Sequence, residues 1–322
     1  MKKWMLYALA VAGLMSASAQ AQTWPDRPVK LIVPTGAGSA TDVMARLLAN
    51  EVSRALNASI YVENVAGNSG LPAHQAAARA TPDGYTFLFT NTSGMALNAV
   101  AFKQLPYDPA KDFTAVALVS DLSPQMLSVH KDVKVNTLPE FISWVKANPG
   151  KVSYGFDITA GASGFQAKLL NRRAGLDMAE VPYRVAAQLV QDAGAGRFPV
   201  LVSSITVAKT FIDSGDLRPV AMFSGRRFPT MPDVATVGET IPGASVDGWF
   251  VVVAPAGTPA AIIEKVNGAI GGFLKLPNTQ ERMHGVGLAS SGPKSVAETA
   301  AFISREQQRW YEIAKEIGIE AQ

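Results

Sequence analysis

Short apolar runs alternate with segments of helical periodicity along most of the chain. Six runs are each followed by such a segment: KLIVP by 41–56, IYVENV by 70–80, YTFLFTN by 93–102, VSYGFD by 161–174, EVPYR by 186–195 and FPVLVSS by 205–213. Apolar stripes also predict a helix at 259–275 and a final helix close to the C-terminus. This alternation predicts parallel sheets covered by helices, which is an α/β fold class.

Two places combine a strand, a turn of small residues and the start of a helix. The first is PTGAGSATD at 34–42, and the second lies within VSYGFDITAGASGFQAKLL at 152–170. A helix N-terminus carries unpaired amides and a partial positive charge, so it can hold an anion without a full counter-charge. Two such turns predict one in each of two domains, facing each other across a cleft.

The first turn has a competing interpretation as a dinucleotide-binding site. Gly36 and Gly38 follow a strand, and Glu63 ends the next strand, where a ribose-binding acid would lie. However, Thr41 stands at the third glycine position, and the aspartate after it adds a negative charge that suits a pyrophosphate poorly. The better local interpretation is Ser39 as the helix N-cap, with that aspartate three residues later, similar to a capping box.

The sequence offers little for catalysis. Its three histidines are far apart, and no G-x-S-x-G or H-E-x-x-H pattern occurs. The chain has no cysteine, which excludes disulfides, thiolate metal sites and a lipoprotein anchor. We therefore expect a binding protein and no metal, nucleotide or covalent cofactor. A secreted enzyme and a structural or adhesive protein are the rival classes.

The N-terminus has the features of a secretory signal. A basic start at 1–3 and an apolar stretch at 4–15 precede SASAQAQ, which offers small residues at Ala19 and Ala21. We place cleavage after Ala21, so that residues 1–21 form the signal peptide and the product is periplasmic. A short N-terminal membrane anchor is the alternative.

Length and charge narrow the possible partners. About 300 residues remain after the signal, which suits two domains. The formal net charge of +3 falls to about +1 without Lys2 and Lys3, and the basic residues are scattered. We therefore expect no nucleic-acid partner and no binding to an anionic membrane.

Several stretches in order carry a family resemblance. From residue 24 to the final helix the chain resembles the periplasmic solute-binding proteins of tripartite tricarboxylate transporters, the Bug or TctC family. The stretches are WPDRPVKLIVP (24–34), PDGYTFLF (82–89), LPYDPAKDF (105–113), KANPGKVSYG (146–155), VPYR (181–184), MPDVATVGE (231–239), GWFVVVAPAGTP (248–259) and the tail FISREQQRWYEIAKEIGIEA.

The resemblance implies a two-domain Venus-flytrap fold that closes on a small carboxylate and delivers it to a permease with a large and a small membrane subunit. It implies that domain 1 combines 22–122 with 248–322 and that domain 2 is 123–247. Two crossings are then expected near 113–125 and 240–250. It also implies a monomer without enzymatic activity.

The resemblance places the ligand carboxylate between the two strand-to-helix turns, partly through ordered waters. One wall would be Gly38, Ser39, Ala40, Thr41 and Asp42, with Asp42 mainly fixing the helix start. The opposite wall would be Thr159, Ala160, Gly161, Ala162 and Ser163, with Phe156 and Ile158 beside it. Secondary candidates follow two further strands: Thr92, Ser93 and Gly94, and Ser203 and Ser204.

The departures from the family pattern favour an apolar ligand body. Phe156 and Ile158 replace polar residues of the usual second turn, and Ser203 stands where many relatives carry an acid that could pair with an ammonium. An aromatic dicarboxylate such as terephthalate is therefore favoured over aliphatic di- or tricarboxylates (citrate, malate, adipate) and amino acids. This preference requires that Phe156 and Ile158 face the cleft and not the core of domain 2.

Overall fold

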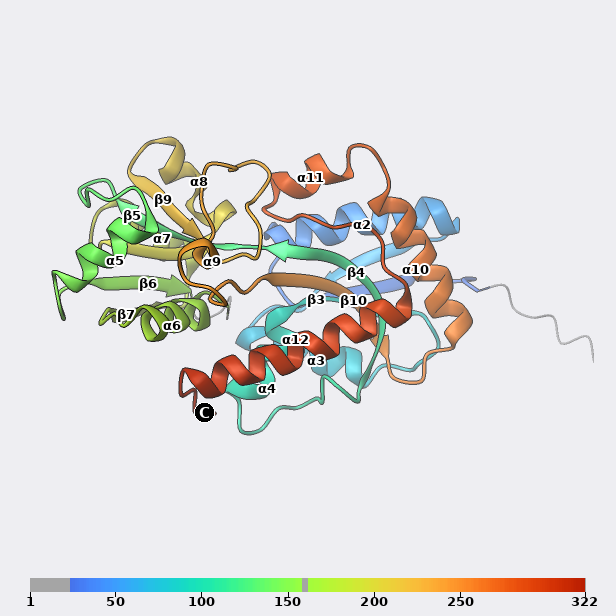
Figure 1. Cartoon of the computed structure of the whole chain (residues 1–322). Coiled ribbons are helices and arrows are strands. Elements are labelled where there is room, and N and C mark those ends of the chain that lie inside the picture. Colours follow the sequence, from blue (N-terminus) through green and yellow to red (C-terminus); the bar gives the residue numbers. More distant parts are fainter. Residues whose placement is uncertain (1–23, 158–161, 322) are drawn as a thin grey trace, which may run out of the picture.

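The computed structural model describes residues 24–157 and 162–321, and it contains two five-stranded sheets, each covered by helices, side by side (Figure 1). The first sheet has the order β2 (Ile60–Asn64), β1 (Val29–Val33), β3 (Thr86–Asn91), β10 (Gly248–Pro255) and β4 (Phe113–Ser123). The second has the order β7 (Ala179–Tyr183), β6 (Ser153–Asp157), β8 (Val200–Ser204), β5 (Gln125–His130) and β9 (Leu217–Met222). The predicted signal peptide and residues 158–161 lie outside the described residues.

Both sheets are mixed, which corrects the expectation of parallel sheets. In the first sheet β10 runs antiparallel to β3 and β4, and in the second β5 runs antiparallel to β8 and β9. The remaining pairs, β1 with β2 and β3, and β6 with β7 and β8, are parallel. The parallel strands of each sheet end at the side that faces the other lobe. Strands β5 and β10 each begin at that side, because the chain enters there from the other lobe, and so they run in the opposite direction.

The first sheet is buried on both faces. Along β1, Leu31 and Val33 pack into one core cluster and Ile32 into another, as alternation along a strand requires. The first face is covered by α2 (Ala40–Leu56) and α10 (Ala260–Leu274), with α11 (Thr279–Gly285) beside α10. The second face is covered by α3 (Leu71–Ala78), the short turns η2 (Asn68–Gly70), η3 (Ser93–Leu97) and α4 (Asn98–Ala101), and α12 (Val296–Glu316).

The second sheet has the same layered arrangement. One face packs against α5 (Leu138–Lys146), α6 (Ala162–Ala174) and α9 (Val237–Thr240), and the other against α7 (Ala186–Gly194) and α8 (Ile205–Asp213). Within the described ranges no helix is both long and apolar enough to cross a membrane.

The chain passes between the two sheets twice. Only Pro124 separates β4 from β5, and the return runs through Val246 and Asp247 into β10. Asp247 accepts the amide hydrogen of Gly225, and burial raises the pKa of this acid to about 6, although Arg226 and other neighbouring groups partly oppose the shift. The two connections lie together, so a core can form across them.

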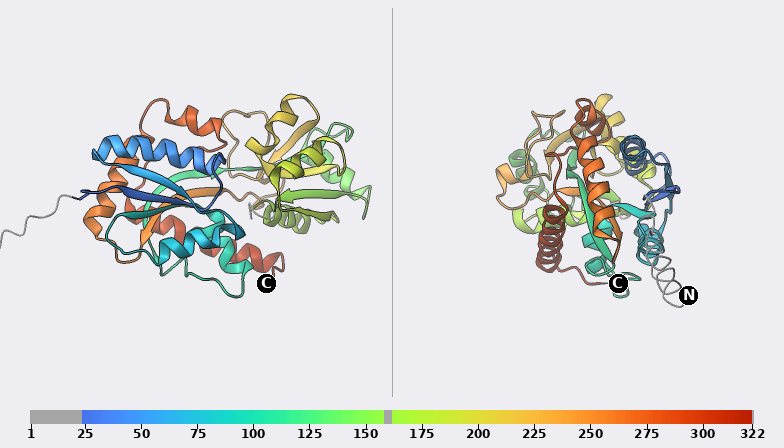
Figure 2. Two further views of the ribbon diagram at one scale, coloured as in Figure 1. Left: turned by 180° about the vertical axis from the view of Figure 1, so that it is seen from behind. Right: turned by 90° about the vertical axis from the view of Figure 1, so that its right-hand side faces the viewer.

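The C-terminal helix α12 belongs to such a shared core. Trp310 and Ile313 of α12 pack in one cluster with Leu169 of α6 and Val246 of the return crossing. At the end of α12, Glu316 forms a bidentate ion pair with Arg173 of α6, with both N–O distances 2.8 Å. Seen from two sides, α12 runs along the first sheet and ends beside the second lobe (Figure 2).

Candidate functional site

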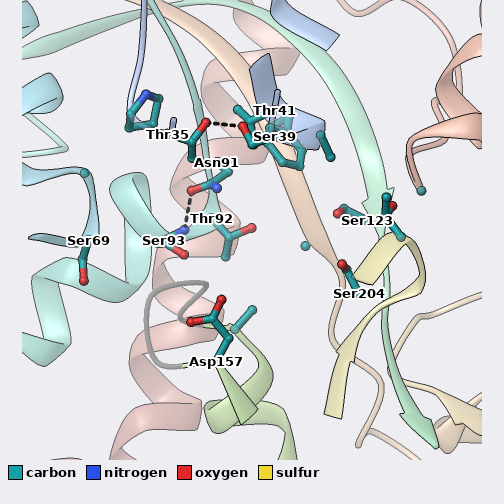
Figure 3. Close-up of a pocket in the computed structure, with 18 of the residues that line it drawn as sticks. Thr35, Ser39, Thr41, Ser69, Asn91, Thr92, Ser93, Ser123, Asp157 and Ser204 are labelled. Atoms are coloured by element: carbon teal, nitrogen blue, oxygen red, sulfur yellow. Dashed lines mark hydrogen bonds between the residues drawn. The ribbon is translucent and has the colours of Figure 1, made fainter. Parts of the chain in front are cut away.

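A cavity of about 470 Å³ lies between the two lobes. Four strands end at it: its lining includes Thr35 after β1, Asn91 of β3, Asp157 of β6 and Ser204 of β8 (Figure 3). Ligands of α/β sheets bind at the carboxyl ends of the strands, so the position is the expected one. The crossings add Ser123, Gln125, Gly248, Trp249 and Phe250 to the lining.

The first turn presents hydroxyl groups and backbone to the cavity. Ser39 is the N-cap of α2, as predicted, and its hydroxyl accepts the amide hydrogen of Asp42 at 3.2 Å. The hydroxyls of Thr35 and Ser39 lie 2.8 Å apart, and Thr41 lies beside them (Figure 3). Because α2 has 17 residues, its N-terminus brings a partial positive charge to this wall.

Asp42 is turned away from the cavity into a network behind the turn. Its carboxylate accepts hydrogen bonds from the Gly38 amide (2.8 Å), Arg46 Nε (3.1 Å) and Asn64 Nδ2 (2.9 Å). Burial alone would raise the pKa of Asp42, but the hydrogen bonds and the charge of Arg46 outweigh it and leave that pKa below its ordinary value. The charge of Asp42 is thus used to fix the helix start.

A second hydrogen-bonded network supports the wall at the end of β3. The side-chain oxygen of Asn91 accepts the Ser93 amide hydrogen at 3.1 Å (Figure 3). Beneath it His74, which lines the cavity but is buried, contacts the Gly70 carbonyl (2.7 Å) and the Thr90 hydroxyl (2.6 Å). Burial lowers the pKa of His74 to about 4, so its imidazole is neutral at pH 7.

The second lobe contributes a carboxylate. Asp157 is the last residue of β6, and its side chain lies across the cavity from Thr35, Ser39 and Thr41 (Figure 3). Ser204 is the N-cap of α8 and accepts the Val207 amide hydrogen at 3.4 Å. No lysine or arginine lines the cavity among the residues that the structure describes.

Phe156 does not face the cavity, which corrects the sequence prediction. Its ring packs in the core of the second lobe, with its centroid 5.5 Å from that of Tyr154 and against the backbone of Gly164. Tyr154 and Phe156 are two residues apart on β6 and share one face of the strand, and Asp157 falls on the other. Ile158 lies outside the described residues.

The remaining candidates divide between lining and supporting positions. Those that line the cavity are Ser39, Ala40, Thr41, Thr92, Ser93, Ala162 and Ser204. Gly38, Asp42, Ser163 and Ser203 do not line it: the hydroxyl of Ser163 donates to the Asp157 carbonyl (3.2 Å), and that of Ser203 to the Ser204 carbonyl. Thr159, Ala160 and Gly161 fall outside the described residues.

The sequence prediction missed Asn91 and His74, and it did not single out Asp157, although the resemblance places the ligand against the stretch from Phe156 to Ser163. Asn91 and Asp157 could have been found, because each is a polar residue that ends an apolar run, and strand ends of this kind meet at one edge of a sheet. His74 and the crossing residues have no comparable local signal.

Two α/β lobes with a cavity at the carboxyl ends of their strands define the class as a binding protein of the Venus-flytrap type. Residues 44–319 match the tripartite tricarboxylate transporter family receptor, and the chain belongs to this family. The family resemblance and the fold predicted from the sequence are thus confirmed.

Individual relatives align with this chain over almost their whole length. Protein BugT of Bordetella pertussis is 31% identical over 96% of this chain and 95% of its own. The structure of R. palustris Rpa4515 with adipate is 30% identical with a TM-score of 0.83, covering 93% of this chain and all of that one. MatC from Rhodopseudomonas palustris with bound malate is 29% identical with a TM-score of 0.77, covering 90% and 99%. These relatives are substrate-binding proteins and not enzymes, as expected for this chain.

Proposed function

We propose that this chain is an exported, monomeric periplasmic receptor that captures a small carboxylate and delivers it to the large and small membrane subunits of a tripartite transporter. The observation that carries the proposal is the cavity at which strand ends of both lobes meet, in a chain of this family. In this proposal the lobes are 22–122 with 248–322, and 123–247, and the signal peptide is 1–21.

The ligand carboxylate is best accommodated at the N-terminus of α2. The hydroxyls of Ser39, Thr41 and Thr35 lie at that wall, together with the partial positive charge of the helix. Each charge-assisted hydrogen bond contributes about 1.5–3 kcal/mol, whereas micromolar affinity requires about 8 kcal/mol. One wall therefore falls short, and contacts from the opposite lobe complete the site when the cavity closes.

The ligand body was expected to be aromatic, of the terephthalate type, because Phe156 and Ile158 were expected to face the cavity and Ser203 offers no acid for an ammonium. Since the ring of Phe156 lies in the core, we place aliphatic carboxylates ahead of aromatic ones. The hydroxyl and amide groups of the lining support this choice. The adipate and malate of the two R. palustris structures point the same way by analogy.

A thermal-shift screen tests the proposal. Purified mature protein is mixed with terephthalate, phthalate, benzoate, protocatechuate, adipate, malate, citrate and aspartate, and each hit is measured by isothermal titration. We expect at least one carboxylate to raise the melting temperature without being converted. Ser39→Ala should weaken its binding, whereas Ser214→Ala, on the exposed far end of α8, should not. Turnover of a bound carboxylate, or no shift with any acid, would overturn the proposal.

A further inference from the structure

We propose that a buried polar cluster of His74, Tyr107 and Asn98 positions the cavity wall formed by residues 66–70 and thereby sets the affinity of the cavity for its ligand. The inference rests on the proposed function and deepens it. Tyr107 and Asn98 do not line the cavity, and His74, which does, has both ring nitrogens hydrogen-bonded to protein groups. The cluster therefore acts through the backbone that it holds and not by hydrogen bonds to the ligand.

The wall at 66–70 has an uncommon backbone. All five of its residues line the cavity, with Ser69 among them (Figure 3). The angle φ is positive at four consecutive positions: Gly67 (110°), Asn68 (42°), Ser69 (53°) and Gly70 (76°). A left-handed backbone is costly for a residue with a Cβ, and it persists where the surrounding structure determines it. The geometry of this wall therefore depends on contacts outside the segment.

Those contacts come from behind the wall. The side-chain amide of Asn98 donates to the Ser69 carbonyl at 3.2 Å, and Nδ1 of His74 contacts the Gly70 carbonyl at 2.7 Å. Tyr107 connects the two side chains: its ring stacks on the imidazole, with the centroids 4.9 Å apart, and its hydroxyl accepts a hydrogen bond from Asn98 at 3.0 Å. All three side chains are buried. One connected cluster thus holds the two carbonyl groups at the end of the left-handed segment.

The same cluster also holds the neighbouring turn after β3. The Tyr107 hydroxyl donates to the Gly94 carbonyl at 2.7 Å. A Cβ on Gly94 would lie 1.8 Å from Nε2 of His74, so the backbone of this turn packs directly on the imidazole. Two adjacent parts of the cavity wall, 66–70 and 91–93, are therefore fixed relative to each other by one buried cluster.

The hydrogen bonds of His74 also assign its imidazole proton. The ring is neutral at pH 7 and carries one proton. Because the Gly70 carbonyl can only accept, Nδ1 holds that proton and donates it. Nε2 then accepts the hydrogen of the Thr90 hydroxyl at 2.6 Å. The one donor of the ring is thus directed to the wall at 66–70.

The test removes a hydroxyl that lies outside the cavity lining. Tyr107→Phe keeps the stacked ring but loses the bonds to Gly94 and Asn98. The natural protein and the variant are titrated with adipate, malate and terephthalate, and amide hydrogen exchange is measured without any acid. We expect Tyr107→Phe to bind each acid that binds the natural protein about tenfold more weakly, and to exchange the amides of 66–71 about tenfold faster.

A matched control loses a hydroxyl at the far end of β3. Tyr85 precedes β3, and its hydroxyl donates to Asp26, away from the cavity. Tyr85→Phe should change neither the affinity for these acids nor the exchange at 66–71.

Two variants of His74 separate its two hydrogen bonds. The side-chain nitrogen of asparagine can replace Nδ1, so His74→Asn keeps a donor for the Gly70 carbonyl, whereas the longer glutamine places its nitrogen closer to the position of Nε2. His74→Asn should therefore bind the acids about fivefold more tightly than His74→Gln. Nitrogen-15 NMR of the natural protein should show the tautomer of His74 with the proton on Nδ1.

Several outcomes would overturn the inference. Unchanged affinity or unchanged exchange at 66–71 in Tyr107→Phe would reduce the cluster to a purely structural role. A His74 proton on Nε2, or equal affinity of the two His74 variants, would contradict the assigned donor. If the His74 variants do not fold, Tyr107→Phe, which lacks a single oxygen atom, still decides the question. If no acid binds the natural protein, the proposed function fails, while the exchange rates and the tautomer decide separately whether the cluster positions the wall.

Discussion

The β1–α2 turn and the β6–α6 turn stand at corresponding places in the two lobes, yet their acids lie on different sides of the cavity wall. Asp42 of the first turn points backward, where Gly38, Arg46 and Asn64 satisfy its carboxylate. Asp157 of the second lies at the end of its strand with its side chain in the cavity lining. The first acid fixes the helix start from behind the turn, and the second lines the cavity.

The difference shows why a polar turn cannot be interpreted from residue types alone. A helix N-terminus needs an acceptor for its free amides, and an acid can serve from behind as Asp42 does. The same residue type one position beyond a strand's core-facing residue lies on the other face of the strand instead, as Asp157 does among the cavity lining. Four measurements would break or sharpen this contrast.

The largest effect is expected at Asp42. Asp42→Ala removes the acceptor of three hydrogen bonds at a residue that is only 3% exposed, and should lower the free energy of unfolding by about 3 kcal/mol. Urea denaturation measures the loss. Asp213→Ala removes an exposed acid from α8 and should cost less than about 0.5 kcal/mol. Equal losses in the two variants would contradict a building role for Asp42.

A third acid, Asp247 at the return crossing, should make the stability of the protein depend on pH. Burial raises its pKa to about 6 from an ordinary value of 3.8, so the folded state holds a proton that the unfolded state has released. Stability from this group is therefore present below about pH 4 and is lost as the pH rises to about 6. The free energy of unfolding of Asp247→Asn should be about 2 kcal/mol higher than that of the natural protein at pH 7, and the two should be equal at pH 4. A difference independent of pH would refute this assignment. Asp42, whose pKa is lowered, should show the opposite sign.

The packing of the two turns differs as well. A Cβ on Gly164 would lie 2.7 Å from the Phe156 ring, whereas a Cβ on Gly36 would meet nothing within 4 Å. Gly164→Ala should therefore cost about 1–2 kcal/mol of unfolding free energy, and Gly36→Ala less than about 0.5 kcal/mol. Thermal unfolding of the two variants provides the measurement. A tolerated Gly164→Ala would show that Phe156 can move out of the core.

The smallest effects distinguish the two serines. Ser39→Ala removes an N-cap and should cost about 1 kcal/mol of stability together with about tenfold in ligand affinity, because Ser39 also lines the cavity. Ser163→Ala loses the bond to the Asp157 carbonyl and should cost a similar amount of stability while affinity stays nearly constant. Titration of both variants with a hit from the screen tests this, and an affinity loss confined to Ser163→Ala would place the ligand on the second turn.

Local patterns predicted six of the ten strands that the structure describes, with the helical segments after them, but not the direction of every strand. The helix predicted at 205–213 coincides with α8 (Ile205–Asp213), and that at 41–56 differs from α2 by one residue. The antiparallel strands β5 and β10 were not recognised because direction within a sheet depends on where the chain crosses between lobes. Periodicity carries no information about such crossings.

For the candidate site, too, the sequence predicted residues whose positions depend on their sequence neighbours, but not those whose positions depend on the folded topology. Ser39 could be identified because an N-cap depends on neighbours in the sequence. Phe156 was placed wrongly because a shift of one residue at the end of a strand moves a side chain to the opposite face. Trp249 and Ser123 reach the cavity only through the folded topology, so no local signal could indicate them.

The shared core along α12 has a mechanical consequence for exchange of the ligand. Separating the lobes at this edge would expose Trp310 and Ile313, and burial of each large apolar side chain is worth about 1.5–3 kcal/mol. The Arg173–Glu316 pair crosses the same edge. Rotation about an axis close to α12 avoids that exposure, whereas a parallel separation of the lobes does not. We therefore expect the mouth of the cavity to widen on the side away from the C-terminal helix, so that α12 acts as the stationary element of an otherwise mobile receptor.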